Sequence, residues 1–177
     1  DRMMGVGSSA LFNTMSRLVP DGAVLTVDVG NHAYSFGRYF ECGERQSVLM
    51  SGYLGSIGFG FPAAMGAWAA DPTRPLFAVT GDGGFGQYLA ELTTAVKHDM
   101  DLTHVLLNNS SLGKISKEQR AGRFEVWQTD LHNPNFSEYA RLCGAHGVRV
   151  TDADDLDAAL VDAMAHRGPS LVEVITD

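Results

Sequence analysis

Five short runs of mostly apolar residues, rich in β-branched side chains, place the tightest limits on how this chain can fold. Because the runs show little alternation of apolar and polar residues, strands formed from them would be buried on both faces, as in a parallel sheet covered by helices. The sequence therefore predicts an α/β fold, a single domain with an open, mostly parallel sheet and helices on both faces. The predicted strands are Ala23–Val29, Leu76–Thr80, Thr103–Leu107, Gly147–Val150 and Leu171–Ile175, and the predicted helices are Ser8–Leu18, Pro62–Ala70, Phe85–Lys97, Asn135–Cys143 and Asp154–His166.

Composition and charge narrow the possible partners. With 177 residues, 45% of them hydrophobic, the chain is long enough to bury one core, and no linker divides it. The net charge of −8, without a Lys/Arg cluster, argues against nucleic acid and anionic membranes as partners. The most apolar window, Ser56–Ala70, is too short to cross a bilayer, so no membrane insertion is expected. Cys42 and Cys143 are too few for a disulfide framework, so we expect a cytoplasmic location.

A glycine-rich loop follows the second predicted strand, in the stretch TGDGGFGQYLA, Thr80–Ala90. Its glycines fit the G-x-G-x-x-G pattern of dinucleotide-binding sites, but such sites need an acidic residue at the end of the next strand. Here the next strand ends in Asn108 and Asn109. Asp82 would also lie beside the bound pyrophosphate, and two such charges about 4 Å apart repel by about 4 kcal/mol at an effective dielectric constant of about 20. A cation between them would remove this repulsion.

Magnesium is the cation that suits these residues. It prefers six oxygen ligands and is commonly held by one or two protein groups together with substrate phosphates and water. Asp82 offers a carboxylate oxygen, Asn109 an amide oxygen and Ser111 a backbone carbonyl. Each motif taken alone is more often a simple turn or cap. Their joint occurrence at consecutive strand ends predicts a site for Mg²⁺ and a diphosphate.

The backbone of the same loop favours phosphate binding. The glycines Gly81, Gly83 and Gly84 would let the main chain approach the phosphates, and a helix beginning near Phe85 would point its free N–H groups toward their charge.

At these residues the chain resembles the thiamine diphosphate-dependent enzymes. Gly81-Asp82-Gly83 followed by Asn108-Asn109 resembles their signature, with a spacing slightly shorter than usual. SGYLGSIGFGFPAAMGA (Ser51–Ala67) and TVDVGNH (Thr26–His32) are similar to two further segments of the acetolactate synthase, pyruvate oxidase and 2-oxo acid decarboxylase group. The resemblance implies the thiamine diphosphate-binding fold, with residues 1–177 as the carboxyl-terminal pyrophosphate domain.

The resemblance also implies a role for each matching residue. Asp82, Asn109 and the Ser111 carbonyl would ligate Mg²⁺, and the Gly55 carbonyl would accept a hydrogen bond from the cofactor's aminopyrimidine. Ile57 would be the apolar wedge that keeps the two cofactor rings bent, although by itself it reads as a core residue. The remaining residues implied to contact thiamine diphosphate are Gly30, Asn31, His32, Ser56, Gly81, Gly83, Gly84, Leu112 and Gly113. For His32 the alternative is a strand-end histidine that faces solvent.

No catalytic residue is expected in this chain. In the family, a glutamate from a separate pyrimidine-binding domain activates the cofactor, and Glu91 is interpreted as structural rather than as its substitute. The pyrimidine-binding and middle domains are expected to lie outside these residues, so the domain alone is expected to be inactive. Because the chain begins at Asp1 and not at Met, we expect a fragment of a longer enzyme in preference to one subunit of a split enzyme.

The implied activity is the decarboxylation of a 2-oxo acid such as pyruvate, followed by acyl transfer as in acetolactate synthase. Pyruvate oxidase, quinone-dependent pyruvate dehydrogenase and 2-oxo acid decarboxylase remain alternatives, and the intact enzyme could bind FAD. A homo-oligomer is expected, with part of the apolar run Ile57–Ala69 facing the partner. Alternatives of other classes are a dinucleotide-dependent oxidoreductase and a non-catalytic phosphate or nucleotide-binding module. Four polar residues either line the substrate pocket or face water: Lys114, Lys117, Gln119 and Arg120.

Overall fold

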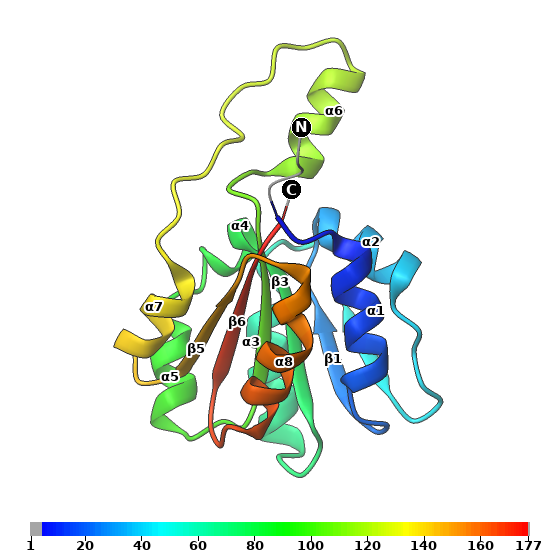
Figure 1. The fold of residues 1–177 in the computed structure, drawn as a ribbon. Coiled ribbons are helices and arrows are strands. Elements are labelled where there is room, and N and C mark those ends of the chain that lie inside the picture. The colour runs from blue at the N-terminus through cyan, green and yellow to red at the C-terminus, as the bar shows by residue number, and fades with distance from the viewer. Residues whose placement is uncertain (1–4, 177) are drawn as a thin grey trace.

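The protein is described by a computed structural model that places residues 5–176. Six strands form one sheet in the order β2-β1-β3-β4-β6-β5, and every neighbouring pair is parallel (Figure 1). The open parallel sheet confirms the α/β prediction. The strands are β1 (Val24–Val27), β2 (Ser47–Met50), β3 (Leu76–Gly81), β4 (Thr103–Asn108), β5 (His146–Val150) and β6 (Ser170–Ile175).

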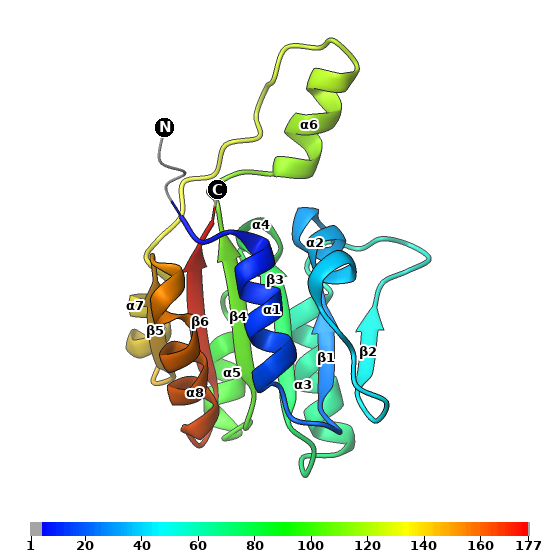
Figure 2. The same ribbon diagram turned by 45° about the vertical axis from the view of Figure 1, so that its right-hand side comes forward.

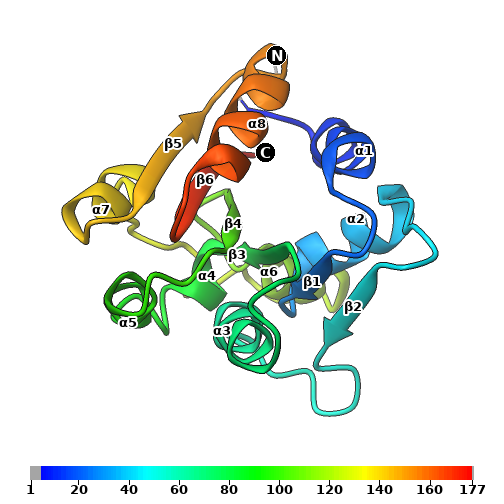
Figure 3. The ribbon, with the colours of Figure 1, turned by 90° about the horizontal axis from the view of Figure 1, so that it is seen from below.

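Helices cover both faces of the sheet, as predicted (Figure 3). One face packs against α1 (Ser8–Leu18), α2 (Asn31–Tyr39) and α8 (Leu156–Ala165), and the short 3₁₀ helix η1 (Ala153–Asp155) precedes α8. The other face packs against α3 (Gly60–Ala70), α5 (Glu91–Lys97) and α7 (Phe136–Leu142).

The strand residues explain why both faces are covered. Successive side chains of a strand point to opposite faces. In β3, Phe77 and Val79 belong to the core under α1 and α8, whereas Leu76 and Ala78 belong to the core under α3 and α5. All four are buried, so burial of each face stabilises the sheet at roughly 25 cal/mol per Å² of apolar surface.

Besides the short helix α4 (Asp82–Phe85), three elements were not predicted from the sequence. They are β2, an edge strand whose last two residues are exposed, and the helices α2 and α6 (Gly113–Ala121). Each contains at most one buried apolar residue, so no apolar run marks it in the sequence.

The predicted helix Phe85–Lys97 is confirmed only in its second half, Glu91–Lys97, and is wrong before Glu91. A four-residue helix, α4 (Asp82–Phe85), begins directly at the glycine-rich loop, residues 86–90 form turns, and α5 begins only at Glu91. Glycine is about 1 kcal/mol less favourable than alanine in a helix interior, and the loop contains Gly83, Gly84 and Gly86. The weak local propensity lets the chain turn before α5 starts.

The strand order reverses between β1 and β3, because the chain passes from β1 to the edge strand β2 and then crosses to β3 on the other side of β1. Ligands of open α/β sheets bind outside the carboxyl ends of the strands at such a point. Above this edge, α6 and the segment that follows it, residues 122–135, project away from the sheet (Figure 2). We call residues 122–135 the strap. Within residues 5–176, no helix has the length and apolar character needed to cross a membrane.

Candidate functional site

A cavity of about 610 Å³ lies beyond the carboxyl ends of β1, β3 and β4. Its walls come from the loops after these strands, the loop before α3 and the first turn of α6. The predicted cofactor residues that line it are Gly30, Asn31, His32, Gly55, Ile57, Gly81, Asp82, Gly83, Gly84, Asn109, Ser111, Leu112 and Gly113. Of the predicted set, Ser56 does not line the cavity; its N–H donates to Oγ of Ser51 at 3.1 Å.

The register of two central strands brings the two predicted metal-binding motifs together. β3 pairs with β4 so that Gly81 lies opposite Leu107. Asp82 directly follows β3, at the level where β4 ends with Asn108 and continues into Asn109. Parallel strands end at the same edge of a sheet, so residues far apart in the sequence become neighbours there.

Asp82 is buried, with 4% of its surface exposed. Its Oδ1 accepts a hydrogen bond from the N–H of Gly83 at 2.9 Å, and its Oδ2 accepts one from Nδ2 of Asn133 at 2.7 Å. Burial raises the pKa of the Asp82 carboxyl, and these hydrogen bonds oppose the rise. A cation bound at this carboxylate would offset the cost of keeping it buried and ionised.

The loop after β4 supplies neutral oxygens. Oδ1 of Asn109 accepts a hydrogen bond from the N–H of Ser111 at 3.1 Å, which folds residues 109–111 into a turn at the cavity wall. The cavity therefore joins one carboxylate with an amide and backbone carbonyls, the kinds of oxygen ligand that suit Mg²⁺. In the described part of the chain, no three His, Cys, Asp or Glu side chains gather in a metal-binding cluster. A metal at Asp82 would thus depend on these neutral oxygens and on its ligand.

His32 is buried at the start of α2 with 8% of its surface exposed, so the alternative of a solvent-facing histidine is wrong. Its ring lies where a Cβ at Gly81 would come within 2.9 Å of Nδ1, so the ring and the glycine-rich loop are in close contact. Burial lowers the pKa of His32 to about 4, so the ring is neutral at pH 7. Its Nε2 has no hydrogen-bond partner among the residues that the structure describes. A neutral imidazole lining this cavity has one N–H to offer to an anion.

Asp28 is a residue of the site that the sequence analysis did not single out. It lies at the end of β1 with 0% of its surface exposed, and its carboxylate accepts hydrogen bonds from the N–H groups of Val29 at 2.8 Å and Gly58 at 2.8 Å. Burial raises its pKa and these bonds oppose the rise. Asp28 thereby fixes the loop before α3. The sequence feature that could have identified Asp28 is that it is the single acidic residue in the mostly apolar strand run Ala23–Val29.

The loop that Asp28 fixes carries Gly55 and Ile57. Gly55 has φ of 67°, in the left-handed region that favours glycine. Ile57 is 40% exposed and lines the cavity, so it presents an apolar surface to a ligand and is not part of the core. In the following apolar run, Phe61 and Ala64 are buried in the core under α3.

The sequence profile described as thiamine pyrophosphate enzyme, C-terminal TPP binding domain, matches residues 28–174. The chain belongs to this family. The thiamine pyrophosphate-binding domain is 38% identical over 155 residues to the putative thiamine pyrophosphate-containing protein YdaP of Bacillus subtilis, covering 88% of this chain and 27% of the relative. It is 32% identical over 171 residues to acetolactate synthase isozyme 1 large subunit of Escherichia coli, covering 94% of this chain and 30% of the relative. It is 33% identical over 170 residues to acetolactate synthase 2, chloroplastic, of Nicotiana tabacum, covering 91% of this chain and 26% of the relative.

The thiamine pyrophosphate-binding domain thus spans between a quarter and a third of the length of these relatives. Its residues fit a diphosphate and a divalent cation, because one carboxylate, neutral polar side chains, glycine backbone and a neutral imidazole line one cavity. Glu91 lies at the start of α5 and does not line this cavity.

The four polar residues after Gly113 have three different surroundings in the structure. Lys114 lines the cavity, whereas Lys117 and Arg120 are exposed on α6. Gln119 instead holds the strap, because its side chain bonds both the N–H and the carbonyl of Trp127 at 3.2 Å.

Proposed function

We propose that this domain binds thiamine diphosphate and Mg²⁺ in an enzyme that decarboxylates a 2-oxo acid such as pyruvate and transfers the resulting acyl group, the activity that the resemblance to the acetolactate synthases implies. The observation that carries the proposal is the single cavity in which Asp82, Asn109 and Ser111 meet the glycine-rich loop and His32. Asp82, Asn109 and the Ser111 carbonyl would hold Mg²⁺, while His32 and the backbone of residues 83 and 84 would contact the diphosphate.

The remaining lining residues suit the organic part of the cofactor. Ile57 offers an apolar contact for the two rings, and the Gly55 carbonyl an acceptor for the aminopyrimidine. When bound, thiamine diphosphate supplies a nucleophilic carbon that adds to the ketone of the substrate and accepts the electrons released with carbon dioxide. This chain's own residues orient that cofactor and keep its phosphate charge neutralised, which is electrostatic and positional work.

The proposal extends to partners. The activating glutamate would come from a pyrimidine-binding domain of the same or another subunit, so the cofactor would lie between domains in a cytoplasmic homo-oligomer. Ile57, Tyr53 and Leu54 lie exposed at the loop before α3, where such a domain would cover them. FAD, if the intact enzyme has it, would bind mainly outside this domain.

Calorimetry on the full-length gene product tests the proposal. The wild type should bind thiamine diphosphate in the presence of Mg²⁺ and lose most of that binding with a chelator. Asp82→Ala should abolish the Mg²⁺-dependent binding, whereas Asp101→Ala, an exposed aspartate before β4, should leave it unchanged. Unchanged affinity in Asp82→Ala would eliminate Asp82 as a ligand. Fluorescence titration showing tight NADH binding without thiamine diphosphate binding would favour the dinucleotide alternative.

A further inference from the structure

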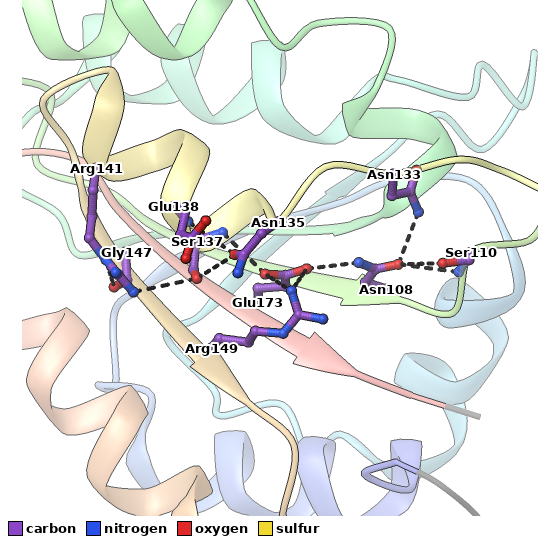
Figure 4. A network of polar contacts seen from close by, with 10 residues as sticks. All are labelled: Asn108, Ser110, Asn133, Asn135, Ser137, Glu138, Arg141, Gly147, Arg149 and Glu173. Carbon is purple, nitrogen blue, oxygen red and sulfur yellow. Dashed lines mark hydrogen bonds and ion pairs between the residues drawn. The ribbon is translucent and has the colours of Figure 1, made fainter.

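Asn133 connects the strap to the proposed magnesium site. It lies in the strap, between α6 and α7, and the sequence analysis assigned it no role. Its Nδ2 donates one hydrogen bond to Oδ2 of Asp82 at 2.7 Å and another to Oδ1 of Asn108 at 3.0 Å (Figure 4 shows Asn133 and Asn108). The Asn133 amide nitrogen is thus hydrogen-bonded both to Asp82, which follows β3, and to Asn108, the last residue of β4.

A buried network determines which way this amide points. Nδ2 of Asn108 donates to Oε1 of Glu173 at 2.8 Å, and Glu173 is buried with 0% of its surface exposed (Figure 4). The Glu173 carboxylate is also paired with Arg149 at 3.2 Å and accepts from the N–H of Ser137 at 3.1 Å. A carboxylate paired with a guanidinium stays ionised and only accepts hydrogen bonds.

The donor and acceptor roles then follow in sequence. Because Glu173 only accepts, Asn108 turns its amide nitrogen to Glu173 and its oxygen to Asn133. Asn133 therefore faces two acceptors, Asn108 and Asp82, and must present its nitrogen to both. The orientation of the Asn133 amide follows from the ion pair between Glu173 and Arg149 and does not depend on the choice of an amide flip.

Backbone bonds fix the strap close to the second proposed ligand loop. The N–H of Leu112 donates to the carbonyl of Thr129 at 2.8 Å, and the N–H of Leu131 donates to the carbonyl of Ser110 at 2.8 Å. Residues 129–131 are therefore paired with residues 110–112, and Asn133 lies two residues beyond Leu131.

We propose that Asn133 is a positioning residue for Mg²⁺: it holds one oxygen of Asp82, while the N–H of Gly83 holds the other, so that the carboxylate keeps the orientation that the metal needs. This inference rests on the proposed function. Groups that orient a metal ligand are worth 10- to 100-fold in metal affinity in known sites. Removing the Asn133 amide should weaken Mg²⁺ binding to that extent even though Asn133 itself does not ligate the metal.

The experiment uses the full-length gene product and titrates Mg²⁺ by calorimetry at saturating thiamine diphosphate. Asn133→Ala is compared with Asn135→Ala, since Asn135 lies two residues along and caps α7 through the N–H of Glu138 without touching Asp82. Thermal melting of the metal-free proteins measures the loss of stability alone. The expected result is a Mg²⁺ dissociation constant raised 10- to 100-fold in Asn133→Ala only, with thiamine diphosphate binding restored at high Mg²⁺ concentration.

Three results are decisive. Equal Mg²⁺ affinity in Asn133→Ala and the wild type overturns the inference. So does an equal loss in Asn133→Ala and Asn135→Ala, because the effect would then be structural. A wild type that binds no thiamine diphosphate with Mg²⁺ overturns the proposed function itself. If Asn133→Ala does not fold, the smaller change Asn133→Ser is titrated against Asn135→Ser with the same criteria.

Discussion

The carboxylate of Asp28 fills the space that a side chain at Gly84 would need. A Cβ at position 84 would overlap Oδ2 of Asp28 and come within 3.0 Å of its Cγ. The end of β1 and the glycine-rich loop after β3 are therefore packed directly against each other, and Asp28 also holds the N–H of Gly58 on the loop before α3. One buried carboxylate keeps three walls of the cavity in place.

Gly84→Ala should destabilise the protein by about 1–3 kcal/mol, the usual cost of overfilling a packed site. Urea denaturation measures it. Gly66→Ala is the matched control, because Gly66 lies exposed in α3 with no heavy atom within 4 Å of a new Cβ. Alanine is favoured there by about 1 kcal/mol, so Gly66→Ala should stabilise slightly. The double variant Asp28→Ala/Gly84→Ala should lose less unfolding free energy than the sum of the losses in the two single variants, because removing the Asp28 carboxylate makes room for the new methyl group. Strict additivity would contradict the contact.

His104 should make the protein less stable as the pH falls. The ring is fully buried between Phe61 and Phe85, and its Nε2 lies 2.7 Å from Oγ1 of Thr80. Its Nδ1 has no hydrogen-bond partner within residues 5–176. Burial lowers its pKa from 6.5 to about 3. Below pH 6.5 the unfolded chain takes up a proton that the folded chain does not, so the stability contributed by the neutral ring is lost between pH 6.5 and about 3.

The comparison of wild type with His104→Phe isolates this effect. Relative to His104→Phe, the wild type should lose up to about 1.4 kcal/mol of unfolding free energy per pH unit below pH 6.5. His98→Phe, at an exposed position, serves as the control. A difference that stays constant from pH 7 to pH 5, or an NMR titration of His104 with a midpoint near 6.5, would show that the ring is not held neutral.

Lys114 should set the preference for an anionic substrate. Among the described residues that line the cavity, within 5–176, it is the one Lys or Arg side chain, and His32 is neutral at pH 7. Its Nζ bonds Oε1 of Glu118 at 2.8 Å and lies 5.0 Å from the ring centre of Tyr34. In the full-length enzyme, Lys114→Met should raise KM for a 2-oxo acid about tenfold, the worth of one hydrogen bond to a charged group, with a smaller change in kcat.

Lys117→Met is the control for Lys114. Lys117 is exposed on the same helix and does not line the cavity, so its loss should leave KM unchanged. Steady-state kinetics with pyruvate decides between the two outcomes. An equal rise in KM with both substitutions would indicate that the overall positive charge on α6 matters, and it would contradict a direct contact between Lys114 and the substrate carboxylate.

Several parts of the fold follow from local sequence alone. Helix α1 begins and ends at the predicted residues, Ser8 and Leu18, and β3 and β4 each extend one residue beyond the predicted run. Helix α1 has a clear hydrophobic period, whereas β3 and β4 are continuous, mostly apolar runs that are buried on both faces. The missed elements β2, α2 and α6 bury at most one apolar side chain each. The helix predicted through Gly86 is interrupted because glycine weakens the helix there.

The sequence by itself determined the class of fold and the chemistry available to the site. Apolar runs without alternation require a sheet covered on both faces, and an aspartate among glycines beside paired asparagines requires a cation if a diphosphate binds there. Only the tertiary structure decided which groups act together. His32 is buried, Asp28 holds the loop of Gly58, and Asn133 returns from the strap to Asp82. The physical reason is that these contacts join segments remote in the chain, so they depend on strand register and packing and not on any local pattern.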